Sequence, residues 1–252
     1  MQTIKSLLTV AVLHLCTISL HAQIVNIEGK RIATDTVGFA GSLGINLSAS
    51  KFTQSFVAAN INGHLQYKTK KDLILLISDY EVVNAGGENF NNSGFLHLRY
   101  NRKLSKVIRS ELFTQAQYNS VTKLDVRLLN GLGLRFKLSQ YERAKFYWGV
   151  AAMYEHEQVE DEGTMNDVRL SSYLTFTLRP EKTVVFSNTT YAQPRIDNFA
   201  DYRISNNSRL QFDITKQLKF VTNFSFLYDA KPPIEVPKVN YQIRNGLTYK
   251  FN

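Results

Sequence analysis

The last stretch of the chain, "KVNYQIRNGLTYKFN" (residues 238–252), alternates apolar and polar residues. Its apolar positions are Val239, Tyr241, Ile243, Leu247, Tyr249 and Phe251. A period of two places successive side chains on opposite faces of an extended chain, so this stretch is predicted to be a β-strand with one apolar face. The same period runs through most of the chain after residue 36. The class of protein therefore depends on whether the apolar faces contact a core or lipid.

Twelve segments show this alternation, and none keeps apolar residues at helical spacing over three turns. The predicted strands span about residues 38–49, 55–68, 72–82, 94–102, 107–118, 126–138, 145–157, 168–178, 183–193, 201–213, 218–228 and 239–251. Most are longer than strands of soluble sheets and close to the roughly 9–11 residues that cross a bilayer at a tilt. Short turns alternate with five longer loops, 83–93, 119–125, 158–167, 192–201 and 229–238, which is typical of outer-membrane barrels.

Two or more charged residues share one face in six of the predicted strands, as Arg109 and Glu111 do. A charge that faces lipid at the bilayer midplane would cost roughly 2–4 kcal/mol. The charge-free faces are therefore predicted to contact lipid, and the charged faces to line a lumen. The candidate lumen-lining residues are Arg99, Arg109, Glu111, Arg135, Glu155, Arg169, Arg203, Arg209 and Arg244. Strand 183–193 has no internal charge, and Ser187, Thr189 and Tyr191 are assigned to its lipid face.

Aromatic residues mark both ends of the apolar faces. The interfacial candidates are Tyr118, Tyr154, Tyr228 and Tyr241 at the long-loop rim, and Trp148, Tyr249 and Phe251 at the short-turn rim. Two such girdles are typical of the two membrane interfaces. The sequence predicts an all-β fold, a membrane-spanning antiparallel up-and-down β-barrel of about 12 strands, closed so that its backbone groups are paired. The alternative is a soluble barrel or sandwich whose apolar face lies in a core.

The N-terminal 22 residues have the features of a secretory signal peptide. Lys5 is followed by an apolar run from Leu7 to Leu20, and Ala22 precedes the expected cleavage point. The run is shorter than the roughly 20 residues of a spanning helix. Residues 23–36 are predicted to be a periplasmic lead-in, with a plug as the alternative, and residues 37–252 are predicted to be the barrel. This organisation places the protein in the outer membrane of a Gram-negative envelope. Cys16 is the only cysteine, so disulfides and thiol chemistry are excluded from the exported chain.

Four stretches resemble the salt-induced outer-membrane protein family, a domain of unknown function. They are "NGLGLRFKL" (Asn130–Leu138), "GVAAMYEHE" (Gly149–Glu157), "YAQPRIDNFADYRI" (Tyr191–Ile204) and "LYDAKPPIEVPKVNYQIRNGLTYKF" (Leu227–Phe251). The resemblance extends from about residue 37 to the C-terminus. It implies an outer-membrane barrel and a link to osmotic or envelope stress, and it implies no established activity or catalytic residues.

No residue pattern points to an enzyme, a cofactor or a metal site. The histidines of the exported chain, His64, His97 and His156, have no serine at a suitable strand spacing. The acidic stretch 155–167 lacks the ligand spacing of a calcium loop, and a solvated acidic rim is the simpler interpretation. "GLG" at 131–133 lacks the third glycine and the helix of a nucleotide-binding loop. The net charge of +9 is scattered, so no nucleic-acid partner is predicted.

Two functions remain open. One is a narrow pore for small polar solutes, because inward side chains set selectivity in such barrels. The alternative is a structural or adhesive envelope barrel that acts through its extracellular loops and has a closed lumen. The predicted partners are outer-membrane lipids, the barrel-assembly machinery during biogenesis and, for a pore, a small polar solute, while the sequence does not indicate an oligomeric state. Side chains that meet across the axis would count against the pore.

Overall fold

The computed structural model describes residues 37–51, 55–215 and 218–249, and the predicted signal peptide and lead-in lie outside them. Within this part of the chain no helix is both long and apolar enough to cross a membrane. The elements are β1 (Gly38–Lys51), β2 (Ser55–Lys68), β3 (Asp72–Ala85), β4 (Glu88–Lys103), β5 (Ile108–Asn119), the short 3-10 helix η1 (Ser120–Thr122), β6 (Leu124–Gln140), β7 (Ala144–Val159), β8 (Gly163–Leu178), β9 (Val184–Pro194), β10 (Tyr202–Asp213), β11 (Leu218–Asp229) and β12 (Val239–Tyr249). The prediction of an all-β chain with 12 strands is confirmed.

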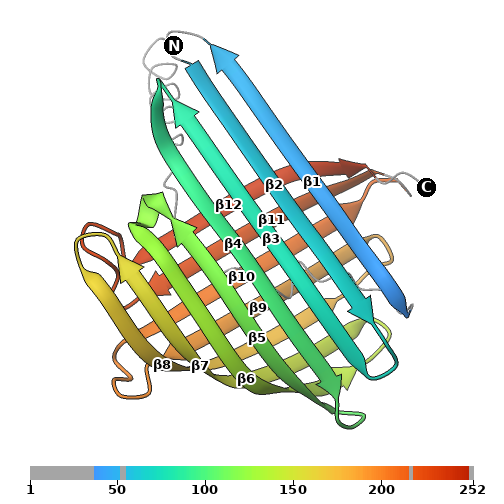
Figure 1. Cartoon of the computed structure of the whole chain (residues 1–252). Coiled ribbons are helices and arrows are strands. Elements are labelled where there is room, and N and C mark those ends of the chain that lie inside the picture. The colour runs from blue at the N-terminus through green and yellow to red at the C-terminus, as the bar shows by residue number, and fades with distance from the viewer. Residues whose placement is uncertain (1–36, 52–54, 216–217, 250–252) are drawn as a thin grey trace, which may run out of the picture.

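All strands belong to one antiparallel sheet in which each strand pairs with its neighbours in sequence, from β1 to β12. The sheet curls so that β1–β4 lie in front of β9–β12 in Figure 1, and the two walls cross at a steep angle. This is the up-and-down barrel topology that was predicted. The expected pairing of the first strand with the last is absent among the described residues, where β1 pairs with β2 and β12 with β11.

Burial alternates along the strands as the sequence does. In β7, Met153 and Glu155 are buried, whereas Ala152 and Tyr154 are exposed. The buried set points to the concave, inner side of the sheet, because its members contact one another across strands. The exposed set includes large apolar side chains from most of the sheet, among them Leu43, Leu65, Leu98, Leu112, Leu132, Leu174 and Ile243.

Two of the predicted long loops are instead tight hairpins. Gly86 and Gly87 form the turn between β3 and β4 with φ of 66° and 90°. Positive φ at both central residues matches a type I′ hairpin turn, for which Gly-Gly is well suited. Between β7 and β8 only residues 160–162 leave the strands. The predictions of loops at 83–93 and 158–167 are therefore wrong, since the strands extend well beyond the predicted ends.

The predicted orientation of β9 is also wrong. Thr189 and Tyr191 are buried on the inner face, where Thr189 lies next to Thr175 and the ring of Tyr191 lies 5.1 Å from that of Tyr173. Ser187 shares their face, opposite the inward Arg209. β9 contains no charged residue that would show which of its faces points inward, so the sequence alone did not give its orientation. The outer face of β9 and β10 instead carries a ring of four hydrogen bonds among Asn188, Ser208, Asn206 and Thr190.

Candidate functional site

Most of the predicted lumen-lining residues are buried on the inner face. Those buried are Arg99, Glu111, Arg135, Glu155, Arg169 and Arg203. Arg109 and Arg209 are half-buried, near the short-turn ends of β5 and β10, and the side chain of Arg244 lies outside the described part of the structure. The six buried residues form two groups at different positions along the barrel axis.

The first group is a charge network near the long-loop rim. Arg203 of β10 donates to two glutamates of β7, with Nη1 2.6 Å from Glu155 Oε1 and Nη2 3.0 Å from Glu157 Oε2. Strands β8 and β9 separate these residues along the sheet, so the contacts pass through the interior of the barrel. Charged side chains from two parts of the wall therefore meet inside the lumen.

Arg127 of β6 binds the same two glutamates from the other side. Its Nε lies 2.9 Å from Glu155 Oε1, and its Nη2 lies 2.8 Å from Glu157 Oε1. Arg169 of β8 adds a third guanidinium, with Nε 2.6 Å from Glu155 Oε2. The planar forks of arginine suit such shared carboxylates, because each presents several donors in fixed directions. Glu155 thus joins three buried arginines.

The network extends into the loop that precedes β10. Arg169 Nη2 lies 3.1 Å from Asp201 Oδ1, and Arg195 Nη1 lies 3.4 Å from Asp201 Oδ2. Arg195 also donates to Asp197, and this hydrogen bond holds the pKa of the Asp197 carboxyl below its usual range. The loop between β9 and β10 is therefore fastened to the charged interior. Asp201, at the boundary between a predicted loop and a predicted strand, is thus a partner of the inward Arg169.

The second group lies nearer the short-turn rim, and Tyr173 is at its centre. Its hydroxyl donates to Glu111 Oε2 at 2.6 Å, and β6 and β7 separate the two strands concerned. Arg99 and Arg135 lie 3.6 and 3.9 Å from the other oxygen of Glu111. Gly149 makes room for the ring, since a Cβ there would lie 2.1 Å from Tyr173 Cε1. This is a second place at which distant strands contact each other inside the barrel.

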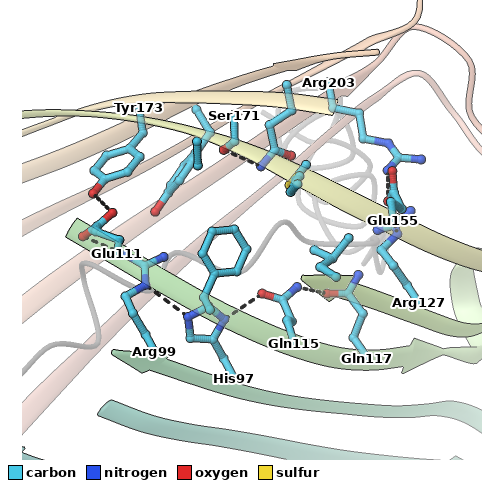
Figure 2. Close-up of a pocket in the computed structure, with 16 residues that line it drawn as sticks. His97, Arg99, Glu111, Gln115, Gln117, Arg127, Glu155, Ser171, Tyr173 and Arg203 are labelled. Atoms are coloured by element: carbon cyan, nitrogen blue, oxygen red, sulfur yellow. Dashed lines mark hydrogen bonds and ion pairs between the residues drawn. The ribbon is translucent and has the colours of Figure 1, made fainter. Parts of the chain in front are cut away.

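A row of hydrogen-bonded polar side chains, called here the polar file, runs along β4 and β5 between the two groups (Figure 2). It consists of Arg99, His97, Gln115 and Gln117. Arg99 Nε donates to His97 Nε2 at 3.3 Å, and His97 Nδ1 lies 3.0 Å from Gln115 Oε1. Since Nε2 accepts, Nδ1 carries the proton and donates to Gln115. Gln115 Nε2 in turn donates to Gln117 Oε1 at 2.8 Å. The donors all point the same way, from Arg99 to Gln117.

A small cavity lies between the two groups and the polar file (Figure 2). Its lining includes Glu111, Tyr173, Gln117, Arg127 and Arg203. The acidic and basic groups around it are engaged with one another, which leaves their charges largely compensated. Among the described residues, no group of three or more histidine, cysteine, aspartate or glutamate side chains could hold a metal ion.

The loop 230–238 covers a second, smaller cavity at the long-loop rim. This cavity is lined by Arg203 and Asp229 below and by Pro232, Pro233 and Val236 of the loop. Lys123 Nζ lies 2.6 Å from Glu235 Oε2 and lowers the pKa of the Glu235 carboxyl. The backbone N–H of Ile234 donates to Glu162. The loop is thus tied to the ends of β6 and β8 and lies over the charge network.

The predicted interfacial aromatics lie on the outer face where they are described. Trp148, Tyr154 and Tyr241 are exposed, and Tyr118 and Tyr228 are half-buried. The ring of Trp148 stacks on Phe136 at 5.3 Å, and its Nε1 donates to Ser172 Oγ at 3.1 Å. The side chain of Tyr249 and the whole of Phe251 lie outside the described residues.

The candidate lumen-lining set omitted several residues that complete the site. They are Arg127, Glu157, Asp201, Asp229 and Tyr173. Strand parity places Arg127 and Glu157 on the same charged faces as Arg135 and Glu155, although the candidate set left them out. Tyr173 could have been found in the same way, because it shares a face with Arg169. Asp201 and Asp229 lie at strand ends, where parity gives no guidance.

The model of the family described as "Protein of unknown function, DUF481" matches residues 44–251. Similar solved structures include the NanC porin, with 12% identity, a TM-score of 0.49, and 84% of this chain and 99% of that chain covered. The KdgM porin is 12% identical, with a TM-score of 0.44, and the match covers 85% of this chain and 99% of that chain. That protein has also been solved in complex with disordered oligogalacturonate. The translocator domain of the autotransporter NalP from Neisseria meningitidis is 9% identical, with a TM-score of 0.44, and the match covers 84% of this chain and 87% of that chain. No curated protein matches the chain.

Proposed function

The chain belongs to the family described as "Protein of unknown function, DUF481", and on that premise we propose that it is an outer-membrane β-barrel with a closed lumen. Its role is structural or adhesive and is exerted at the long-loop rim. Residues 1–22 direct export, and the barrel-assembly machinery inserts the chain. The resemblance to the salt-induced outer-membrane protein family adds osmotic or envelope stress as the setting of this role.

The outer face supports a lipid environment. In β6, Leu132 is 64% exposed whereas Arg127 and Arg135 are buried. A soluble protein has the reverse distribution, because charged side chains are rarely buried and large exposed apolar patches are rare. In a bilayer the same distribution is favourable, since lipid solvates the leucines and the interior pairs the arginines.

The observation that carries the closed lumen is the pair of contacts between distant strands. Arg203 reaches Glu155 and Tyr173 reaches Glu111, each past two intervening strands. Removing one partner of a buried ion pair by mutation lowers the free energy of unfolding by about 3–5 kcal/mol, because the charge of the other partner is left uncompensated. The two contacts therefore hold β10 against β7 and β8 against β5 inside the barrel.

A narrow pore is the second candidate, and the small cavity between the two groups is the observation in its favour. A pore needs a continuous aqueous path with groups that bind a solute weakly enough to release it. The cavity is instead bordered by the Tyr173–Glu111 contact and by the charge network around Glu155. The arrangement therefore favours a sealed interior over a conduction path.

Planar-bilayer recording tests this proposal. The purified wild-type barrel is expected to give no conductance steps above those of the empty bilayer. The double variant Glu155→Ala/Arg203→Ala removes the contacts of Arg203 with both glutamates of β7 and leaves the net charge of the interior unchanged. This variant is expected to give short openings. Insertion of both proteins is checked by the heat-dependent gel mobility typical of folded barrels. Regular conductance steps from the inserted wild type would contradict the closed lumen and favour the pore.

A further inference from the structure

The short-turn rim carries an excess of exposed basic side chains. Its turns join β2 to β3, β4 to β5, β6 to β7, β8 to β9 and β10 to β11. In the described part of these turns and within two residues of them, the exposed basic residues are Lys70, Lys71, Arg102, Lys103, Lys106, Arg143, Arg179 and Lys182. The exposed acidic residues there are Glu142 and Glu181. The eight basic residues, called here the basic rim, give this end of the barrel an exposed charge of 8 − 2 = +6.

The opposite rim has the opposite sign. Among the described residues of the long-loop rim, the exposed acids are Asp125, Glu160, Asp161, Glu162, Asp197 and Glu235, and the exposed bases are Lys51, Lys231 and Lys238. The exposed charge of that rim is therefore 3 − 6 = −3. Between the rims, the described outer face exposes no charged side chain. The barrel thus has a positive end and a negative end, and an anionic ligand is attracted to the positive one.

Hydrogen bonds between adjacent turns bring basic residues next to one another. The backbone N–H of Lys103 donates to the carbonyl oxygen of Lys71 at 2.8 Å, and that of Arg179 donates to the carbonyl oxygen of Arg143 at 2.7 Å. Like charges that lie opposite each other on neighbouring strands are destabilising. An anion beside these pairs would relieve the repulsion.

The carboxylates of the chain do not neutralise the basic rim. Within the described part of the chain, none of its eight residues forms a salt bridge, whereas Lys123 at the opposite rim is paired with Glu235. Asp72, which is paired in register with Arg102, accepts instead from the hydroxyl of Tyr100 at 2.7 Å. The positive charge of the basic rim is therefore left for a ligand from outside the chain to neutralise.

Aromatic side chains mark the membrane interface beside the basic rim. On the outer face, at the short-turn ends of β6–β8, the ring of Trp148 stacks on that of Phe136, and the ring of Phe146 lies 6.0 Å from that of Phe176. Aromatic girdles of this kind lie at headgroup level in membrane barrels. Turns such as residues 141–143 extend beyond these rings, away from the middle of the strands. The long side chains of the basic rim therefore lie within reach of the lipid phosphates.

We propose that the basic rim binds the headgroups of anionic phospholipids in the leaflet that surrounds the short turns. In outer-membrane barrels this is the periplasmic leaflet. The binding rests on the proposed function, because it requires a barrel inserted in a bilayer. Guanidinium groups donate paired hydrogen bonds to a phosphate, and ammonium groups bind it as point charges, so both kinds of side chain suit a headgroup.

The layout of the basic rim fits a lipid surface better than a free anion. Its residues come from four consecutive short turns, from the β2–β3 turn to the β8–β9 turn, and these strands are neighbours in the sheet. They therefore form an arc around the barrel instead of converging on one pocket. Anionic lipids present many charges along such an arc, and their attraction for basic residues adds up residue by residue. A single phosphate ion would meet only one or two of these groups.

The fluorescence of Trp148 reports which lipids lie next to the basic rim, because it is the only tryptophan and follows Arg143 by five residues. The barrel is reconstituted in vesicles of phosphatidylcholine and phosphatidylglycerol at low salt. Two preparations have the same lipid composition and the same mole fraction of label, and differ only in which lipid is brominated near the headgroup end of its acyl chain. Brominated phosphatidylglycerol is expected to quench Trp148 several-fold more than brominated phosphatidylcholine.

Salt gives the first control. The excess quenching by phosphatidylglycerol is expected to disappear at 1 M salt, because the screening length there is only about 3 Å. Equal quenching by the two lipids at low salt would overturn the proposal, and so would an excess that persists at 1 M. Wild-type protein that neither brominated lipid quenches would overturn the proposed function itself, because Trp148 would then not lie in a bilayer.

Two charge-reversal variants locate the effect on the barrel. Arg179→Glu/Lys182→Glu alters the basic rim, and Lys231→Glu/Lys238→Glu makes the same change of net charge, 2 × (−2) = −4, at the opposite rim. All four residues are exposed, and heat-dependent gel mobility checks that both variants fold. The first variant is expected to lose most of the excess quenching of Trp148, and the second to keep it. Any other pattern would overturn the proposal.

Discussion

Replacement of Glu155 by alanine is expected to lower the free energy of unfolding of the lipid-inserted barrel by about 3–5 kcal/mol. The Glu155 carboxylate accepts from Arg127, Arg169 and Arg203 at 2.6–2.9 Å. Its removal leaves three guanidinium groups close together in the interior with less negative charge to compensate them. Urea titration of the barrel in vesicles, followed by the fluorescence of Trp148, measures the change.

The control for this substitution is Glu160→Ala in the turn between β7 and β8. Glu160 is exposed and lies outside the charge network. Exposed substitutions of this kind usually change stability by no more than about 0.5 kcal/mol. If Glu155→Ala and Glu160→Ala shifted the unfolding midpoint equally, the charge network would not contribute to stability as the contacts imply.

An arginine in place of Leu132 is expected to destabilise the inserted barrel by roughly 2–4 kcal/mol. Leu132 lies at the middle of β6, on the outer face, and is 64% exposed. In a bilayer this position is near the midplane, where a guanidinium loses its hydration and finds no counter-charge. The same urea titration in vesicles gives the magnitude.

Leu104→Arg serves as the matched control, because it makes the same substitution at an exposed leucine in the turn between β4 and β5. Near a membrane interface the cost falls to about 0–1 kcal/mol. A depth-dependent difference between the two variants supports the lipid assignment. Equal costs at both positions would mean that the outer face of β6 is not in contact with hydrocarbon.

Sequence periodicity was sufficient to predict the strands and the face on which most charged residues lie. A charge fixes the phase of a strand, because it is tolerated on only one side of a wall in lipid, as with Arg127 and Arg135 in β6. Strand β9 has no such marker, and its phase could be established only through its pairing with β8 and β10. The Gly86–Gly87 turn was missed because the polar residues around it suggested a loop.

The closure of the lumen could not be deduced from the sequence. Whether Tyr173 reaches Glu111, or Arg203 reaches Glu155, depends on the curvature of the sheet and on the register of strands that are not adjacent. Alternation within a strand assigns each side chain to a face and gives no information about distances across the barrel. Parity likewise places Leu75 and Ile77 on the face of Asp79, but it does not show that they pack with Phe95 of β4 in a buried apolar cluster.

The central claim is that one face of this alternating sheet contacts lipid while the other closes the interior, and Trp148 tests it without a mutation. It is the only tryptophan of the chain, and it lies on the outer face, 41% exposed, beside Phe136. In vesicles, lipids brominated near the headgroup end of the acyl chain are expected to quench its fluorescence strongly, and aqueous iodide only weakly. Strong quenching by iodide with no effect of the brominated lipids would contradict the account.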